Sequence, residues 1–204
     1  MSEFDAKAAT WDQDPLKVER ALTVGRAIAA AVPVEGKAIL EYGCGTGLLG
    51  FALQPLAAQV TLADTSEGML EVLRGKIAAA GAANMAPLRL DLLADGLPAE
   101  RYDLICSLMT LHHIPDTQGI LRRFHEVLVP GGWVALADLD TEDGSFHGPA
   151  VTDVHLGFDR TVLSGQLTAA GFVQVQCSTA YEIRREVAGV LRTFPVFLAV
   201  GQKP

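Results

Sequence analysis

The chain has 204 residues, half of them hydrophobic, with a formal charge of −8 and a pI of about 5.0. That length suits one core rather than two separate domains, and an acidic chain whose Lys and Arg occur at most in pairs lacks the basic stripe of nucleic-acid-binding proteins. The sequence has no run of ~18 apolar residues to span a membrane, no secretory signal at its acidic start, and an odd number of widely spaced cysteines that suits a reducing compartment. We therefore expect a cytoplasmic protein with a small-molecule partner, no nucleic-acid partner and no membrane span.

The first predicted element is an amphipathic helix over residues 14–32. Its inward face is expected to carry Val18, Leu22, Gly25, Ala29 and Val32. After it, short apolar runs alternate with helical patterns. The predicted strands are Lys37–Glu41, Gln59–Asp64, Pro87–Asp91, Tyr102–Leu108 and Trp133–Asp138. The predicted helices between them are Leu48–Ala57, Glu67–Ala80 and Gln118–Leu128. This alternation indicates a parallel sheet covered on both faces.

The last third of the chain follows a different pattern. A surface loop is expected over residues 139–158, followed by a helix over Asp159–Ala170. Two strand-like runs, Val173–Ile183 and Thr193–Gly201, are joined too closely for a crossover helix and predict an antiparallel hairpin. The predicted fold is therefore α/β, a Rossmann-like doubly wound seven-stranded sheet that is mostly parallel with an antiparallel C-terminal strand. We expect one domain over residues 1–204, with an N-terminal helical lid (1–35) on a Rossmann-like core (36–204).

The stretch ILEYGCGTGLLG at residues 39–50 predicts a ligand-binding loop. Residues 45–50 fit the dinucleotide pattern G-x-G-x-x-G, yet Gly43 already occupies the turn position directly after the strand. A second pattern, acid-x-Gly-x-Gly-x-Gly, begins at Glu41 and ends at Gly47. Both patterns place backbone N–H groups and a helix N-terminus beside a ligand, but Glu41 would repel a pyrophosphate and suits a cationic ligand.

Further acids and a turn separate the two patterns. Asp64 and Asp91 each end a predicted strand, and Pro-Gly-Gly at residues 130–132 precedes the fifth strand. Together with the glycine loop, these features resemble the class I S-adenosylmethionine-dependent methyltransferases over residues 36 to 203. The start, FDAKAATWD at residues 4–12, is similar to the ubiquinone/menaquinone-biosynthesis-like branch (methyltransferase type 11/12). The resemblance implies S-adenosylmethionine as cofactor and S-adenosylhomocysteine as product.

The resemblance also implies a set of cofactor-binding residues. In this family the glycine loop wraps the amino-acid end of the cofactor, an acid in the place of Asp64 accepts the ribose hydroxyls, and one in the place of Asp91 meets the adenine amino group. The expected cofactor-binding residues are Glu41, Gly43, Cys44, Gly45, Thr46, Gly47, Asp64, Thr65, Met69, Asp91, Leu92, Ser107 and Leu108. Cys44 is expected to be a small filler of the loop rather than a nucleophile.

The catalytic candidates are His112 and His113, which follow the fourth predicted strand. One of them would orient an acceptor or take its proton near neutral pH. The alternative is that the pair caps the next helix or packs beneath it. Trp11 either covers the mouth of the site or pins the N-terminal segment to the body of the protein.

No metal site is expected. A group of acids and one histidine follows the fifth strand and consists of Asp138, Asp140, Glu142, Asp143 and His147. Hard cations prefer such oxygen ligands, but the divalent-ion methyltransferases place an aspartate where this chain has Ser107. Most of these acids are therefore expected to be solvated. Ser107 also begins a segment unlike the Asp/Asn-Pro-Pro-aromatic motif of the enzymes that methylate nucleic-acid bases.

The sequence thus predicts methyl transfer from S-adenosylmethionine to a small molecule, with the acceptor atom (oxygen, nitrogen or carbon) left open. An NAD(P)-dependent oxidoreductase is the first alternative, although the chain lacks a Tyr-x-x-x-Lys pair and a second catalytic domain. The second alternative is a protein that binds S-adenosylmethionine without turning it over.

Overall fold

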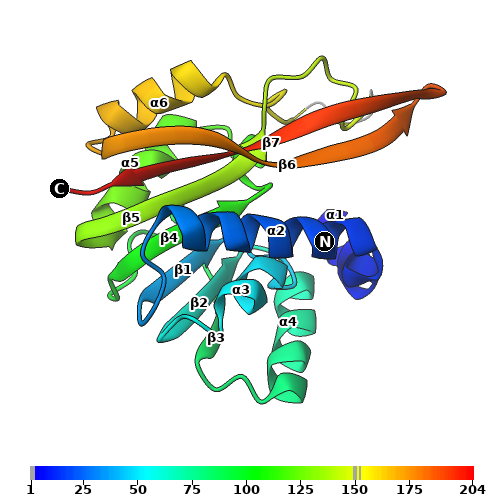
Figure 1. Ribbon diagram of the computed structural model, residues 1–204. Coiled ribbons are helices and arrows are strands. Elements are labelled where there is room, and N and C mark those ends of the chain that lie inside the picture. The colour runs from blue at the N-terminus through cyan, green and yellow to red at the C-terminus, as the bar shows by residue number, and fades with distance from the viewer. Residues whose placement is uncertain (1–2, 149–150, 152) are drawn as a thin grey trace.

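The computed structural model describes residues 3–148, 151 and 153–204. It contains a seven-stranded sheet with the strand order β3-β2-β1-β4-β5-β7-β6 (Figure 1). The strands are β1 (Ala38–Tyr42), β2 (Gln59–Asp64), β3 (Met85–Arg89), β4 (Tyr102–Leu108), β5 (Leu128–Leu139), β6 (Val173–Val187) and β7 (Val190–Gln202). The helices are α1 (Glu3–Lys7), α2 (Pro15–Ala31), α3 (Leu48–Leu53), α4 (Glu67–Ala80), α5 (Thr117–Val127) and α6 (Arg160–Ala169), with 3₁₀ turns η1 (Ala8–Gln13) and η2 (Leu111–His113).

The pairing of the strands confirms the predicted fold class. β1 pairs in parallel with β2 and β4, β2 with β3, and β4 with β5. β7 runs antiparallel to both β5 and β6, so the C-terminal hairpin closes one edge of the sheet. The order of the parallel strands reverses between β1 and β4, and ligands of doubly wound sheets bind at such a reversal.

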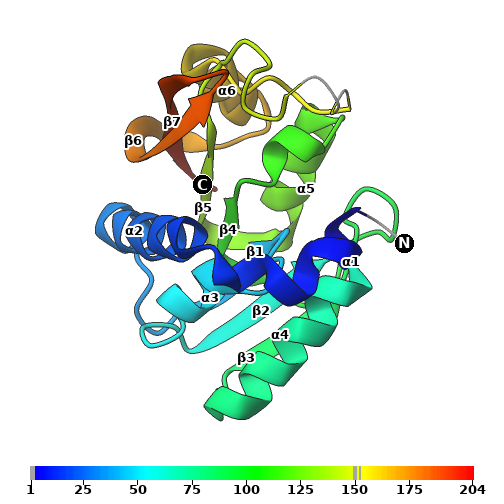
Figure 2. The ribbon, with the colours of Figure 1, turned by 90° about the vertical axis from the view of Figure 1, so that its right-hand side faces the viewer.

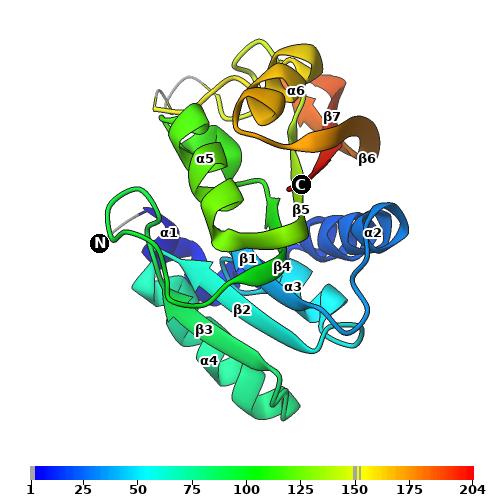
Figure 3. The same cartoon turned by 90° about the vertical axis from the view of Figure 1, so that its left-hand side faces the viewer.

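Helices cover both faces of the sheet and bury two hydrophobic cores. Apolar side chains of α2, α3 and α4 pack on one face, and those of α5 and α6 pack on the other. Figures 2 and 3, two opposite views, both place α2 and α5 on opposite sides of β4. Neighbouring residues of one strand serve different cores, as Leu104 and Ile105 do, because side chains alternate along a strand.

Short polar residues set the starts of the helices. The Asp14 side chain accepts the N–H of Leu16 and is followed by Pro15, which favours the first turn of α2. Ser66 accepts the N–H of Met69 and caps α4, and α4 ends at Gly81 in the left-handed conformation. These caps agree with the predicted bounds of α4, which the structure reproduces without a shift.

Several predicted bounds are wrong by a few residues. α3 ends four residues early, at Leu53, and Leu56 is exposed. β3 ends at Arg89, so Asp91 lies in the following loop instead of at a strand end. β5 begins at Leu128 and contains the Pro-Gly-Gly segment, with a register shift relative to β4.

The inward face of α2 also differs from the predicted one. It is formed by Ala21, Val24, Gly25 and Ile28, whereas Leu22 is 45% exposed. A Cβ on Gly25 would lie 3.0 Å from the Cβ of Ala52, so the close approach of α2 to α3 requires the missing side chain. The predicted stripe was one position out of phase, because it took the bulky Leu22 instead of Ala21 as a core position.

The N-terminal segment is fastened to α4. Asp5 accepts hydrogen bonds from Ser66 Oγ and from the N–H of Gly68, while Asp12 pairs with Lys76 at 2.6 Å. The division into a lid (1–35) and a core (36–204) stays a prediction. Residues 149, 150 and 152 of the predicted loop at 139–158 lie outside the described residues. Among the helices that the structure describes, none combines the length and apolar character needed to cross a bilayer.

Candidate active site

A cavity of about 900 Å³ opens at the carboxyl ends of the parallel strands, which is the size range of small-molecule sites. Its wall includes the glycine loop after β1, the ends of β2 and β4, the η2 turn and the N-terminal segment. Side chains of β6 complete it from the C-terminal hairpin. The cavity therefore lies at the reversal of strand order, where the fold predicts a ligand.

The glycine loop is held by the neighbouring strand β2. The N–H groups of Gly43 and Cys44 donate to the carbonyl of Ala63 at 2.8 and 2.9 Å. Gly43 and Gly45 have φ angles of 72° and 53°, a region that favours glycine. A Cβ on Gly43 would overlap the Thr110 side chain, whereas a Cβ on Gly45 would meet only the Met69 sulfur, at 3.9 Å. Gly43 is thus required for close packing against Thr110, whereas the missing side chain of Gly45 leaves room in the cavity.

Asp64 connects the glycine loop to the start of α4. Its Oδ2 accepts the N–H of Gly45 at 2.7 Å and its Oδ1 accepts the N–H of Ser66 at 2.8 Å. Ser66 itself caps α4, so Asp64 is not the capping residue of that helix. The carboxylate also lines the cavity, and its role toward a ribose stays a prediction.

Glu41 is a buried acid on the cavity wall. It is 2% exposed, and its Oε2 has no hydrogen-bond partner among the described residues. Burial raises the pKa of Glu41 to about 8, against a smaller opposite effect of the Gly50 backbone. A cation placed beside this carboxyl would favour its ionised form.

The other residues expected to bind the cofactor divide into two groups. Those whose atoms line the cavity are Cys44, Thr46, Thr65, Met69, Asp91 and Leu108. Gly47, Leu92 and Ser107 lie behind this wall: Leu92 is fully buried, and Ser107 Oγ donates to the carbonyl of Tyr42 at 2.8 Å. Burial raises the pKa of the Cys44 thiol well above its ordinary value, which favours the filler role over a nucleophile. The binding roles of all of them stay predictions.

His112 and Asp138 form a buried pair beside the cavity. Nδ1 of His112 lies 2.6 Å from Asp138 Oδ1, and the side chains are 1% and 0% exposed. Asp138 also accepts the main-chain N–H groups of His112 and Leu139. The expectation of a mostly solvated acid cluster therefore does not extend to Asp138, which lies inside β5. With Nδ1 directed at the carboxylate, Nε2 is the His112 atom available for chemistry.

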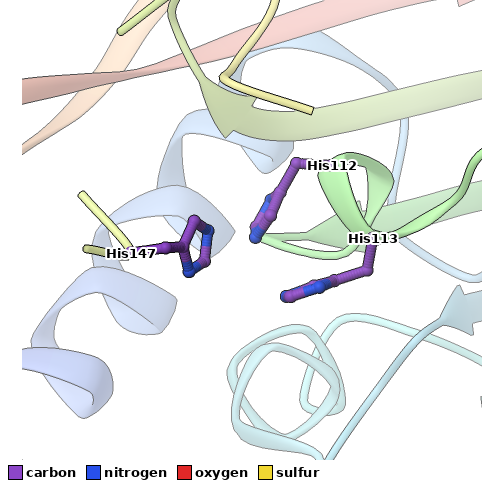
Figure 4. Close-up of side chains that lie close together, drawn as sticks. All are labelled: His112, His113 and His147. Atoms are coloured by element: carbon purple, nitrogen blue, oxygen red, sulfur yellow. The ribbon is translucent and has the colours of Figure 1, made fainter. Parts of the chain in front are cut away.

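Three histidine rings gather at this end of the cavity (Figure 4). The ring centre of His112 lies 4.1 Å from that of His113 and 4.9 Å from that of His147. The Nε2 of His147 has no partner among the described residues, and burial, followed by His112, lowers the pKa of His147. Asp116 caps α5, so the alternative in which a histidine of the pair caps that helix is wrong.

The three histidines are also the group best suited to a metal ion among the residues that the structure describes. One ligand atom from each lies within 4.8 Å of the others. Zinc–nitrogen bonds of ~2.0–2.1 Å in a tetrahedron bring the nitrogens to roughly 3.3 Å from one another. The rings would have to converge on an ion, and the expectation of no metal stays a prediction.

Sequence reasoning missed Arg20, Phe146 and Arg185, which line the same cavity. Arg20 was detectable, because it precedes Val24 by four residues and Ile28 by eight, which places it on the buried stripe of α2. The other two come from the loop after β5 and from the hairpin, where no periodic pattern points to a cavity.

Comparisons with known proteins agree with this arrangement. A family model described as a methyltransferase domain matches residues 40–134. A ubiquinone biosynthesis O-methyltransferase of Bordetella bronchiseptica is 30% identical over 152 residues, which cover 72% of this chain and 63% of that protein. The aklanonic acid methyltransferase DauC of Streptomyces sp. is 31% identical over 147 residues, covering 70% and 66%. The chain belongs to the class I S-adenosylmethionine-dependent methyltransferases.

A solved structure extends the comparison over nearly the whole chain. The DhpI–SAH complex aligns with a TM-score of 0.71 and 25% identity, covering 98% of this chain and 93% of that one. The chain spans 63% of the Bordetella relative's length. The activity and the acceptor of that longer relative are therefore only proposed for this chain.

Proposed function

We propose that this chain transfers the methyl group of S-adenosylmethionine to a small-molecule acceptor and releases S-adenosylhomocysteine. The observation that carries the proposal is one cavity bordered by both the glycine loop with Asp64 and the buried His112–Asp138 pair. The methyltransferase relatives and the DhpI–SAH complex support the same cofactor.

The residues present fit the cofactor at three places. Backbone N–H groups of the glycine loop suit a carboxylate, the unpartnered Oε2 of Glu41 suits positive charge, and Asp64 suits ribose hydroxyls. S-adenosylmethionine supplies an already activated methyl group when bound. The protein's main task is then to align the acceptor atom with that group, and such positioning supplies roughly 7–11 kcal/mol of a barrier.

The histidines are proposed to serve the acceptor. His112, oriented by Asp138, would accept a proton at Nε2 from an acceptor that must lose one, such as a phenol. Asp138 would stabilise the imidazolium that results. His113, whose ring contacts those of His112 and Phe4, would position the acceptor. An amine acceptor that is already neutral would need positioning alone.

The N-terminal segment is proposed to act as a lid. Phe4, Lys7, Trp11 and Lys17 all line the cavity, and Asp12 links the segment both to Thr46 in the glycine loop and to Lys76. We further propose a cytoplasmic location, supported by the three free cysteines, and a small molecule rather than nucleic acid as acceptor, supported by the acidic charge.

Turnover is tested by incubating the protein with S-adenosylmethionine and a panel of phenols, amines and carboxylic acids, and by measuring S-adenosylhomocysteine by mass spectrometry. We expect release that depends on an acceptor. Binding of S-adenosylmethionine without release for any acceptor class would support the silent binding protein instead. Binding of NADH in place of S-adenosylmethionine would support the oxidoreductase.

A further inference from the structure

One arginine on the cavity wall has an unusual environment. Arg20 is mostly buried and lines the cavity, yet its Nε atom has no hydrogen-bond partner. Among the residues that the structure describes, no ion pair involves Arg20. A guanidinium keeps its charge in proteins, and a buried charge without a partner is costly. The arginine is therefore expected to have a partner when the cavity is occupied.

The two acids whose charges act on Arg20 already serve other groups. Asp14 caps α2 through the N–H of Leu16, and Asp138 accepts hydrogen bonds from His112 and from Leu139. Both carboxylates oppose the effect of burial, which lowers the pKa of Arg20. The charges of Asp14 and Asp138 therefore act on Arg20, but neither carboxylate forms a hydrogen bond with it.

Other arginines near the same hairpin show what a paired guanidinium looks like in this protein. Arg160 makes two hydrogen bonds to Asp140 at 2.6 Å, and Arg192 pairs with Asp143 at 2.8 Å. These pairs lie outside the cavity wall. Among the arginines that the structure describes, Arg20 is the one with a buried nitrogen that has no partner.

The cavity wall near Asp138, whose charge acts on Arg20, also carries a second arginine and apolar side chains. Arg185 also lines the cavity and lies with its Cζ 5.3 Å from the centre of the Phe146 ring. Phe146 and Ile183 provide apolar wall, and the histidines stand at the same end as Phe146. This end suits a molecule with an apolar body and an anionic group.

We infer that Arg20 binds an oxyanion of the methyl acceptor, a carboxylate or a phosphonate, while the apolar body of the acceptor rests on Phe146. The inference deepens the proposed function and rests on it. It names the acceptor class as an apolar-bodied acid, and Arg20 as the residue that selects it. The planar fork of a guanidinium matches both oxyanions.

The test uses matched ligands that differ in charge. Benzoate and phenylphosphonate are titrated calorimetrically against benzamide, with and without saturating S-adenosylhomocysteine. We expect at least one of the two anions to bind at least about 10-fold more tightly than benzamide. The anion that binds more tightly shows whether the site prefers a carboxylate or a phosphonate. Equal affinities for all three ligands would overturn the inference.

Two variants assign the effect to Arg20. Arg20→Gln should remove the preference for the anion, whereas Arg26→Gln should keep it, because Arg26 is exposed on the same helix and donates to Thr23. Circular dichroism checks that both fold. Weaker S-adenosylhomocysteine binding in Arg20→Gln, with the anion preference intact, would assign Arg20 to the cofactor carboxylate and overturn the inference. Failure of S-adenosylhomocysteine to bind the unaltered protein would count against the proposed function alone, since the titrations without it still measure the anion preference.

Discussion

His112 and Asp138 are joined by a hydrogen bond of 2.6 Å from which solvent is excluded. The carboxylate also holds the main chain of both His112 and Leu139, so the end of β5 fixes the η2 turn that follows β4. Because the ring nitrogen Nδ1 faces the carboxylate, Nε2 is the nitrogen of His112 left free for chemistry. We propose that Asp138 is a positioning residue that acts through His112.

Asp138→Asn should slow methyl transfer while leaving cofactor binding in place. An asparagine retains the shape but removes the charge that supports an imidazolium. We expect the turnover number to fall about 10²–10⁴-fold, with the affinity for S-adenosylhomocysteine unchanged within about threefold. His125→Gln is the control, because His125 packs on Phe172 away from the cavity. Turnover of Asp138→Asn equal to that of the control would leave the pair a structural feature.

The two glycines of the loop should respond differently to the same substitution. Gly45→Val should abolish binding of S-adenosylmethionine in a folded protein, because the new side chain enters the cavity and strains a positive φ. Gly43→Val should lower the melting temperature more, because its side chain would overlap Thr110. Thermal unfolding and calorimetry measure both effects, and full cofactor affinity in Gly45→Val would remove this loop from the site.

Glu41 gives the ligand-free protein a defined pH dependence. Its pKa is raised from 4.5 to about 8, so between these values the folded state binds more protons than the unfolded state, and stability falls as the pH rises. Glu41→Gln removes this loss. At pH 8 we expect its melting temperature to exceed that of the unaltered protein by at least about 2–4 °C, the shift that 1 kcal/mol produces in a chain of this size.

The same substitution should have the opposite effect on the cofactor. If Glu41 faces the positive charge of S-adenosylmethionine, affinity rises with pH as the carboxylate forms, and Glu41→Gln binds weakly at every pH. A variant that is both more stable and equally tight would show that Glu41 makes no contact with the cofactor.

Removal of divalent ions tests the three-histidine group. We expect methyl transfer to survive dialysis against EDTA, because the histidine nitrogens are spread more widely than a zinc site requires. Loss of activity that returns with one equivalent of zinc would show that His112, His113 and His147 hold a metal.

The sequence predicted the elements whose ends carry strong local signals. β2, β4 and α4 occupy the predicted residues, since apolar runs bounded by Asp64, by Tyr102 and by the Ser66 cap leave little freedom. The predicted bounds of β3 were two residues too late, because the bounds of this strand depend on its pairing with β2, which places Met85 opposite Val60. Such pairing depends on tertiary contacts and leaves no local pattern.

The candidate site was predicted in its loop and in its histidines but not in their partners. Asp138 was grouped with solvated acids, although it lies near the end of the strand beside the one that leads to His112, and parallel strands bring such ends together. Arg20 was overlooked because the stripe of α2 was taken one position out of phase. Phe146 and Arg185 reach the cavity from segments whose placement follows from long-range packing.

Whether this cavity binds S-adenosylmethionine rather than a nicotinamide cofactor is decided by calorimetry. The unaltered protein and Asp64→Ala are each titrated with S-adenosylhomocysteine and with NADH. Asp64 lines the cavity and holds Gly45. We expect one S-adenosylhomocysteine per chain, no heat with NADH, and affinity reduced about 10- to 150-fold in Asp64→Ala. Binding of NADH, or equal S-adenosylhomocysteine affinity in both proteins, would contradict this expectation.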